Sequence, residues 1–315
     1  MTPASACVAG ATGYLGRRVV AELRARSMPV VAILKDPARD ADQTALLAQG
    51  ADLAFVDASR SESYAEALSG VDVAISCMAS GHVHVDATDD FWAIDRDANI
   101  RFGLEAVRSG VRHIVLVATF EGRDSRRVSA FSEAKERAVD AIGGACRQAG
   151  VAFTVIRPTA YFSDLTDRAF DSVLKHGRHT VLGHGLNRIN PVDGADVALF
   201  LADCIGDPTQ AGGEHQVGGP EILSFREIGM LAAEVLGRSK SLRIRSIPIW
   251  SLQLVAALAA VAGPLSRGSR RTEAMLRWMI YSGTHDAIAP ACGRLRLRDE
   301  FCAKRDALPR RGHAD

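Results

Sequence analysis

Short apolar runs alternate with longer amphipathic segments through the first half of the chain. The apolar runs predict strands buried on both faces, and the amphipathic segments predict helices. In chain order the predicted elements are strand 6–9, helix 14–26, strand 29–34, helix 42–49, strand 52–56, helix 62–68, strand 71–76, helix 92–109, strand 113–118, helix 129–149 and strand 152–157. This alternation is typical of an α/β protein with a doubly wound parallel sheet and helices on both faces.

The pattern loosens after Pro158, where helices are predicted over 164–176, 193–205 and 224–236. We expect a smaller C-terminal lobe, which would rise from the carboxyl ends of the strands, close over a ligand and define a substrate site. The expected division is a doubly wound domain over 1–160, a mixed substrate-binding lobe over 161–308 with some segments returning to the first domain, and a tail over 309–315.

The first strand leads into a glycine-rich turn, Gly10-Ala-Thr-Gly13-Tyr-Leu-Gly16, and then a helix. Gly10 permits the sharp exit from the strand, Gly13 lets backbone N–H groups approach a pyrophosphate, and Gly16 lets helix and strand pack closely. The strand–turn–helix context favours dinucleotide binding over an ordinary tight turn. The expected cofactor-binding residues of this turn are Gly10, Thr12, Gly13, Tyr14, Leu15 and Gly16.

The end of the second strand bears on the choice of cofactor. A carboxylate there accepts the ribose hydroxyls of NAD, whereas a cation meets the 2′-phosphate of NADP. Asp36 leaves NAD open, but Lys35 and Arg39 flank the turn and favour NADP(H). Further cofactor-binding candidates follow the third and fourth strands: Asp57, Ala58, Cys77 and Met78.

Composition narrows the class of protein. The chain has 315 residues and a formal net charge of +1, so it lacks the electrostatic footprint of a nucleic-acid-binding protein. Its six cysteines are widely spaced without metal-type pairing, which is typical of reduced thiols in a cytoplasmic protein. Cys7 and Cys77 are expected on core strands, and no metal site or signal peptide is expected.

The segment 247–263 is almost wholly apolar. It is shorter than the ~20 residues that a membrane-spanning helix needs, and Ser251 and Gln253 interrupt it. We expect no integral membrane segment. The segment is predicted to form a buried helix or one lining an apolar pocket, with peripheral membrane contact as the alternative.

Several motifs together resemble the extended and atypical short-chain dehydrogenase/reductases, specifically the NmrA-like branch. They are Gly10–Gly16, Lys35-Asp-Pro37, Asn99, Gly110–Val117, Arg157-Pro-Thr-Ala-Tyr-Phe162, Arg188-Ile-Asn-Pro-Val192 with Asp196, and Val217-Gly-Gly-Pro220. The second half is also similar to divinyl chlorophyllide 8-vinyl reductases, through Phe131-Ser-Glu-Ala-Lys135 as well as the later motifs. The resemblance covers roughly 5–305 and implies a Rossmann fold and a nicotinamide cofactor more firmly than a substrate.

The chain departs from the family pattern at its catalytic motif. Short-chain dehydrogenases typically use Tyr-x-x-x-Lys on a helix, where the phenol passes a proton to the substrate and the lysine grips the nicotinamide ribose. This chain keeps Lys135 but has Phe131 in place of the tyrosine. A phenyl ring cannot donate a proton, so the usual interconversion of alcohol and ketone is not expected. By the resemblance, Lys135 holds the ribose or donates a proton itself, against the simpler interpretation of a helix-surface lysine.

Other candidates come from strand ends. Thr119 stands where the family commonly has a catalytic Ser or Thr, and it would orient substrate or merely satisfy a strand-end amide. By resemblance, Pro158 and Thr159 border the nicotinamide, and Asn99 supports the active-site backbone. Tyr161 is a candidate proton donor, although a tyrosine in a pocket wall needs no such role.

These features predict an NADPH-dependent reductase that transfers a hydride to an apolar small molecule, with an activated C=C bond as the expected acceptor. The alternative is a non-catalytic NmrA-like regulator that senses NADP(H). An epimerase or dehydratase is less favoured because those enzymes usually keep the tyrosine. A monomer or homodimer is expected, with no nucleic-acid partner.

Overall fold

The computed structural model describes residues 4–35, 39–58, 64–80, 91–207, 209–262 and 267–309. The chain divides into two compact units. The first comprises Met1–Pro158 and Gly194–Val217, and the second comprises Thr159–Asp193 and Gly218–Asp315. The chain therefore passes from the first unit to the second, returns for one segment, and leaves again.

The first unit is built on a seven-stranded sheet with the order β3-β2-β1-β4-β5-β6-β9. The strands are β1 (Ala6–Ala9), β2 (Val30–Lys35), β3 (Asp52–Val56), β4 (Val73–Ser76), β5 (His113–Val117), β6 (Ala152–Pro158) and β9 (Gly213–Val217). Every neighbouring pair is parallel. The predicted doubly wound parallel sheet is thus confirmed. The strand order reverses between β1 and β4, and such a switch point is where ligands bind in open α/β sheets.

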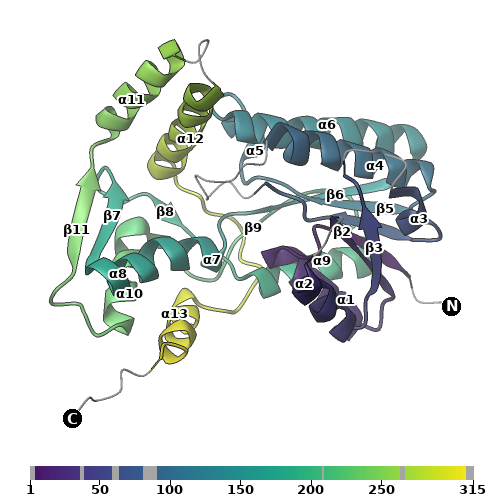
Figure 1. Cartoon of the computed structure of the whole chain (residues 1–315), viewed down its shortest axis with the longest axis horizontal. Coiled ribbons are helices and arrows are strands. Elements are labelled where there is room, and N and C mark those ends of the chain that lie inside the picture. The colour runs from purple at the N-terminus through teal and green to yellow at the C-terminus, as the bar shows by residue number, and fades with distance from the viewer. Residues whose placement is uncertain are drawn as a thin grey trace. The chain divides into compact units, whose positions relative to one another are not determined.

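Helices cover both faces of this sheet (Figure 1). They are α1 (Tyr14–Ala25), α2 (Asp40–Ala48), α3 (Ala65–Leu68), α4 (Asn99–Arg108), α5 (Gly122–Ser125), α6 (Ala130–Ala149) and α9 (Gly194–Gly206). On one face α1 packs against α9, and on the other α4 packs against α6. The single helix predicted over 92–109 is instead a π-helix, η2 (Trp92–Ala98), that continues into α4.

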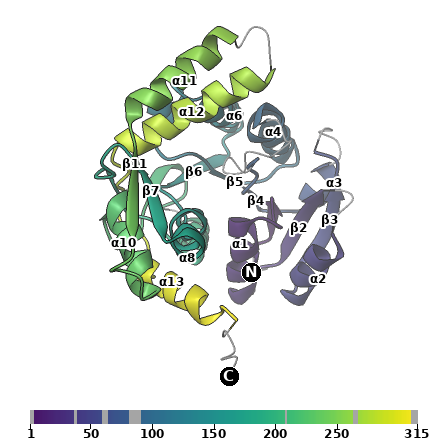
Figure 2. The same ribbon diagram turned by 60° about the vertical axis from the view of Figure 1, so that its left-hand side comes forward.

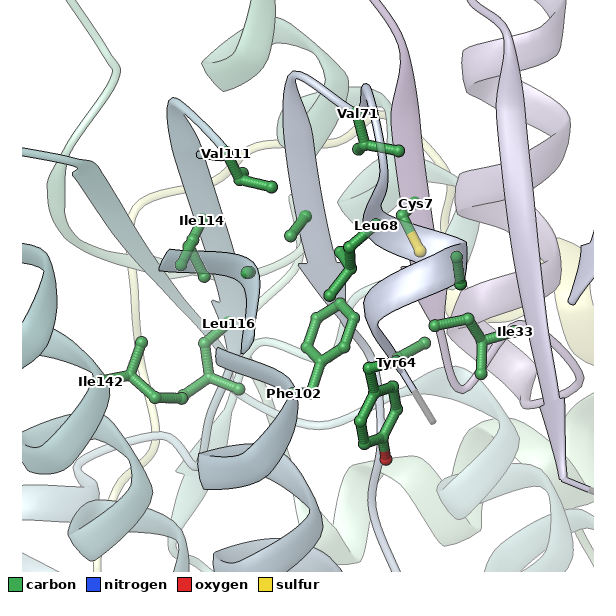
Figure 3. Close-up of a cluster of buried hydrophobic side chains, with 14 of the residues drawn as sticks. Cys7, Ile33, Tyr64, Leu68, Val71, Phe102, Val111, Ile114, Leu116 and Ile142 are labelled. Atoms are coloured by element: carbon green, nitrogen blue, oxygen red, sulfur yellow. The ribbon is translucent and has the colours of Figure 1, made fainter. Parts of the chain in front are cut away.

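The main core of the first unit fills the space between the sheet and the face covered by α4 and α6. Figure 3 shows Cys7 of β1, Ile114 of β5, Phe102 of α4 and Ile142 of α6 converging there. Burying each large apolar side chain contributes about 1.5–3 kcal/mol, so this cluster holds the helices to the sheet. Cys7 is buried as predicted, whereas Cys77 lies just beyond the end of β4 and not within a strand.

The second unit contains two small sheets and several helices. In one sheet β7 (Arg178–Leu182) pairs in parallel with β11 (Arg243–Ile247), and in the other β8 (Arg188–Ile189) pairs in antiparallel fashion with β10 (Leu223–Ser224). The helices are α7 (Phe162–Leu165), π-helical η3 (Thr166–Phe170), α8 (Asp171–His176), α10 (Phe225–Val235), α11 (Ile249–Ala262), α12 (Arg267–Thr284) and α13 (Leu297–Asp306). The single helix predicted over 164–176 is therefore three consecutive helical segments, α7, η3 and α8.

The structure contradicts the prediction of a buried helix in the segment 247–263. The helix α11 forms there, but Trp250, Leu254, Leu258 and Val261 are all more than half exposed. In both views α11 lies along α12 (Figures 1 and 2). Among the described residues, no helix combines the length and the apolar character needed to cross a membrane.

Candidate functional site

The three glycines of the first turn meet different constraints. Gly10 has φ +75°, and a Cβ placed on it would lie 2.8 Å from the carbonyl carbon of Cys77. A Cβ on Gly16 would lie 2.1 Å from the carbonyl oxygen of Gly10, so α1 can pack on the turn only without a side chain there. Gly13 is exposed, and the atom nearest to a Cβ placed on it would be the Gly10 carbonyl oxygen, at 3.3 Å. Gly10 and Gly16 thus form the turn, while Gly13 leaves its outer side open.

The N-terminus of α1 suits an anion. Gly13 is the N-cap residue, it supplies no side-chain cap, and the first turn of the helix contains no acidic residue. Uncapped N–H groups and the helix dipole favour a phosphate at such an end. Leu15 is buried, and the Tyr14 hydroxyl accepts a hydrogen bond from the Gly194 N–H at 3.2 Å. These two residues therefore face the turn with their backbone only, since their side chains are engaged in packing.

Two arginines and one aspartate tie this turn to the region beyond β2. Arg17 Nε donates to the Thr12 carbonyl at 2.8 Å, and its guanidinium pairs with Asp42. Arg39 Nε pairs with the other carboxylate oxygen of Asp42 at 2.9 Å, although its side chain is 80% exposed. Lys35 is exposed at the end of β2. Arg17 therefore contacts the glycine turn, Arg39 is joined to it through Asp42, and Lys35 lies at the end of β2. Asp36 falls outside the described residues.

The expected adenine-side residues follow β3. Asp57 and Ala58 come directly after this strand, and the Ala58 carbonyl accepts a hydrogen bond from Arg101 of α4 at 3.2 Å. That bond fixes the loop that leaves β3, at the same sheet edge as the glycine turn.

The loop after β4 connects the glycine turn to Lys135. Gly10 lies against the backbone of Cys77 and Met78. The Met78 carbonyl accepts a hydrogen bond from Lys135 Nζ at 2.7 Å. Desolvation raises the pKa of the Cys77 thiol to about 12, although the Lys135 charge acts in the opposite direction, so this thiol is neutral at physiological pH. Three segments that are distant in the sequence thus meet at the switch point of the sheet.

Lys135 is not a surface lysine. Its side chain is 4% exposed, and Nζ lies 3.0 Å from Oδ1 of Asp95, whose side chain is fully buried. The second oxygen of Asp95 accepts hydrogen bonds from the N–H and the hydroxyl of Ser80, at 3.1 and 2.5 Å. Asp95 was not a candidate from the sequence. Its position depends on the π-helical turn of η2, and π-helical segments are frequent at functional sites but have no simple sequence signal.

Asn99 supports the same loop. Its side-chain oxygen accepts a 2.6 Å hydrogen bond from the Ser76 hydroxyl, and its amide nitrogen donates to the carbonyls of Ile94, Asp95 and Met78. The residue is fully buried. Asn99 therefore joins the end of β4 to the π-helix that carries Asp95, in agreement with the supporting position expected for it.

A second buried ion pair fixes the segment after β5. Arg157 of β6 makes a two-pronged contact with Glu136 of α6, at 2.6 and 3.0 Å, and also pairs with Glu214 of β9 at 2.9 Å. The same guanidinium donates to the Thr119 carbonyl at 2.8 Å. The Thr119 hydroxyl is buried and has no hydrogen-bond partner among the described residues. Thr119 thus has a fixed backbone and an unsatisfied side-chain oxygen.

The first turn of α6 has Phe131 at the position of the family's tyrosine and a buried serine beside it. Phe131 is half-buried, and Ser132, the next residue, is fully buried. The Ser132 hydroxyl has no hydrogen-bond partner in the part of the chain that the structure describes. Ser132 and Lys135 are three residues apart, so they share one face of the helix. Ser132 is a further candidate, and a single serine in a helical pattern gives no sequence signal that could have identified it.

Two of the expected site residues belong to the second unit. The Thr159 hydroxyl donates to the Asn190 carbonyl at 2.6 Å, and Tyr161 forms a bridge with Val192. Pro158 is the last residue of β6 in the first unit. The structure therefore brings Gly10, Met78 and Lys135 together within the first unit, and places Thr159 and Tyr161 in the second.

The later motifs of the second unit serve its own packing. The Asn190 amide donates to the carbonyls of Gly219 and Ala289, at 3.0 and 2.8 Å, and its oxygen accepts from the Ala289 N–H. A Cβ on Gly218 would lie 2.3 Å from the Asn190 side chain, and one on Gly219 would lie 1.8 Å from the Pro191 carbonyl oxygen. The paired glycines are required because these segments cross at close range.

Comparisons with known proteins agree with this geometry. A family model described as NAD(P)H-binding matches residues 10–208. The chain is 28% identical over 262 residues to the chloroplastic divinyl chlorophyllide a 8-vinyl-reductase of Arabidopsis thaliana, a match that covers 79% of this chain and 61% of the relative. The expected similarity to that group is confirmed. The chain thus spans less than two thirds of the length of this relative.

Solved structures share the fold. One is AtPrR2 with NADP+ and (+)pinoresinol, with a TM-score of 0.73 and 16% identity, covering 96% of this chain and 99% of that one. Another is the triphenylmethane reductase of Citrobacter sp. complexed with NADP(H), with a TM-score of 0.69 and 19% identity, covering 95% and 99%.

Proposed function

Because the chain belongs to the NAD(P)H-binding family, we propose that it is an NADPH-dependent reductase acting on an activated C=C bond of an apolar substrate. The observation that carries the proposal is Lys135. Its ammonium group is buried, bonded to the Met78 carbonyl and to Asp95, and thereby joined to the glycine turn at the switch point of the sheet. This burial and these two contacts support a ligand-positioning role for Lys135 over that of a surface lysine.

The residues of the first unit fit the cofactor. The open side of Gly13 and the uncapped N-terminus of α1 would take the pyrophosphate, and Lys35 and Arg39 would take the 2′-phosphate of NADPH. Bound NADPH supplies a hydride to the substrate. The protein itself supplies position and charge.

Lys135 has the role of a positioning group in this proposal. An ammonium group has three N–H donors, and the Met78 carbonyl and Asp95 take two of them. The third would hold a hydroxyl of the nicotinamide ribose. Asp95 keeps the lysine in place and balances its charge, because an unpaired charge at such a buried position costs several kcal/mol.

The absence of a phenol favours reduction of a C=C bond over reduction of a ketone. Reduction of either bond adds one hydride and one proton, and a ketone requires an acid beside its oxygen. Phe131 cannot serve as that acid. The proton for the carbon centre would come from solvent or from a hydroxyl, for which Thr119 and Tyr161 are the proposed candidates.

The relatives support the choice of substrate class. The Arabidopsis relative is named for reduction of an 8-vinyl group of divinyl chlorophyllide a, which is a C=C bond on a large apolar molecule. We propose a conjugated vinyl group on a substrate of this kind as the acceptor.

The test is anaerobic incubation of the protein with NADPH and divinyl chlorophyllide a. Loss of nicotinamide absorbance is followed together with chromatography of the pigment. We expect one NADPH to be consumed for each vinyl group reduced. Lys135→Met should lower turnover by roughly 10²-fold, the scale expected for misplaced reactants. The matched control is Lys175→Met in α8, whose lysine pairs with Asp171 near the surface and whose loss should not change turnover.

Two other results would change the conclusion. Reduction of a different acceptor, such as a quinone, with the pigment unchanged would keep the reductase and replace the substrate. Tight NADPH binding with no oxidation by any acceptor would favour the sensing regulator.

A further inference from the structure

The helix α11 carries an apolar stripe that the rest of the described chain leaves exposed. Trp250, Leu254, Leu258 and Val261 recur at spacings of four, four and three residues, so they lie on one face of the helix. Their exposed fractions are 66%, 54%, 61% and 80%. Ala256 is the buried residue of this helix. The helix α11 is apolar around almost its whole circumference, and such a helix is normally buried, yet this side of α11 stays exposed.

Positive charge surrounds this stripe in the sequence. No acidic residue occurs between Glu234 and Glu273. Four cations precede the helix: Arg238, Lys240, Arg243 and Arg245. Three follow it: Arg267, Arg270 and Arg271.

Two of these cations have a defined place in the structure. Arg243 and Arg245 are exposed residues of β11, and this strand leads directly through Pro248 into α11. Because alternate residues of a strand share a face, both side chains leave β11 on the same side.

We propose that α11 is an interfacial helix that lies in the headgroup region of an anionic lipid bilayer. Binding in the plane of such a surface depends on the apolar area that enters it and on attraction between basic side chains and anionic lipids. In this chain α11 supplies the apolar area, and the basic residues lie in the segments on either side of the helix. The 14 residues of α11 span about 21 Å, which is shorter than the ~30 Å hydrocarbon core, so the helix lies along the bilayer and does not cross it. Tryptophan is favoured at this depth, and Trp250 begins the stripe.

The positive charge around α11 favours an anionic bilayer over a second copy of this chain as the partner of the exposed stripe. In a two-fold dimer the same patch faces itself, so the basic segments that flank α11 would oppose one another. Anionic headgroups instead attract them. This proposal goes beyond the reductase and does not depend on it.

The experiment is co-sedimentation of the full chain with vesicles. One set contains phosphatidylcholine alone, and the other contains equal parts of phosphatidylcholine and phosphatidylglycerol. We expect binding to the anionic vesicles only, weakened by salt because the charge attraction is screened. Leu254→Gln combined with Leu258→Gln should weaken binding at least about tenfold, because two apolar side chains no longer enter the interface. Met230→Gln is the control, since Met230 is 52% exposed on another helix, α10.

The charge contribution has its own variant pair. Arg243→Gln combined with Arg245→Gln should weaken binding at low salt by about tenfold or more. Arg226→Gln, at an exposed position of α10, should not. Tryptophan emission should move to shorter wavelength with anionic vesicles, and Trp250→Phe should remove most of that shift while binding persists. NADPH binding, measured on every variant, reports that the fold is retained.

Specific results would overturn the proposal. These are no binding to anionic vesicles, equal binding to both vesicle types, or binding that the α11 substitutions leave unchanged. A dimer that Leu254→Gln dissociates, in a protein that ignores vesicles, would assign the stripe to a second copy of the chain.

Discussion

At the scale of single residues, the structure separates positions that the glycine motif groups together. Gly10 and Gly16 are glycines because backbone atoms occupy the space of a side chain: a Cβ would come within 2.8 Å of backbone at Gly10 and within 2.1 Å at Gly16. Gly13 lies in an extended conformation, with φ −74° and ψ 171°, that any residue adopts. A glycine at position 13 is therefore explained by the space that a bound phosphate needs, and not by the backbone conformation.

We predict that Gly13→Ala mainly weakens NADPH binding, whereas Gly16→Ala mainly lowers the stability of the fold. Gly13→Ala should change the free energy of unfolding by less than about 1 kcal/mol, because only a small shift of the Gly10 carbonyl is needed, but it should weaken NADPH binding strongly. Gly16→Ala should destabilise the fold by about 1–3 kcal/mol, because its Cβ overlaps backbone. Urea unfolding and fluorescence titration with NADPH measure the two effects. Normal NADPH binding by Gly13→Ala would place the phosphate elsewhere.

The sequence identified Lys135 but not its surroundings. The motif spacing placed it on a helix, and the structure adds its burial and its contacts with Asp95 and Met78. Asp95 and Ser132 could not be predicted because their significance arises from which elements pack together. The roles proposed for Lys135, Thr119 and Tyr161 remain predictions.

At the scale of elements, the buried guanidinium of Arg157 connects β6, α6, β9 and the segment after β5. Burial of this charge is tolerated because Glu136 and Glu214 pair with it. Gly122 of α5 packs against the same ion pair, since a Cβ there would lie 2.1 Å from Glu136 Oε1 and 2.7 Å from the Arg157 guanidinium. The Glu136 and Arg157 side chains are 0% and 2% exposed and have little room to move aside.

Gly122→Ala should therefore destabilise the protein by about 3 kcal/mol, the scale expected when a buried ion pair is broken. Gly144→Ala in α6 is the matched control, because the nearest atom to its Cβ would be 3.9 Å away. Since alanine favours a helix, that control should gain up to about 1 kcal/mol. Chemical denaturation of both variants measures the difference. Equal stability of the two would show that Glu136 and Arg157 move aside at little cost in free energy.

Two buried histidines predict a dependence of stability on pH. Burial lowers the pKa of His113, whose Nε2 lies 2.8 Å from the Thr154 hydroxyl, and burial also lowers the pKa of His179. Both are neutral in the folded protein at a pH where the unfolded chain, with an ordinary pKa near ~6.5, takes up protons. The free energy of unfolding should thus be constant with respect to these groups above that pH and fall as the pH drops below it.

The slope is at most about 1.4 kcal/mol per pH unit for each histidine. Urea unfolding between about pH 5 and 8 measures it, and His113→Gln should reduce it. His184→Gln, at an exposed turn, should leave it unchanged. A slope that His113→Gln does not alter would contradict the assignment.

The elements of the first unit were predictable where they are apolar and periodic. β1 and β3 match their predicted bounds, and α6 differs by one residue. β9 was missed because its sequence, Gly-Glu-His-Gln-Val, has no apolar run, as suits an edge strand that pairs with β6 alone in this sheet. The strands β7, β8, β10 and β11 were missed because they pair with one another across distant parts of the sequence, outside any repeating strand–helix pattern.

At the scale of the whole molecule, the two units differ in how much of them the sequence specifies. The first unit repeats local strand–helix pairs, so a periodic pattern is sufficient to predict it. The second unit is assembled from segments on both sides of Gly194–Val217, and side chains such as Asn190 join them at long range. The expected cofactor residues from Gly10 to Lys135 all belong to the first unit.

Cofactor binding should therefore stabilise the first unit by mass action. NADPH at 100 times its dissociation constant should raise the free energy of unfolding by about 2.7 kcal/mol. NADH at the same concentration should give less by about 1.4 kcal/mol, because we expect its affinity to be at least about tenfold lower without a 2′-phosphate to meet Lys35 and Arg39. Thermal unfolding with each cofactor measures the difference.

Lys35→Ala and Arg39→Ala should each reduce the advantage of NADPH and leave the effect of NADH unchanged. Arg108→Ala, at the far end of α4, is the control for loss of a surface cation. Equal stabilisation of the native protein by the two cofactors would remove the assigned role of these cations, since the 2′-phosphate is the one group by which the two nucleotides differ.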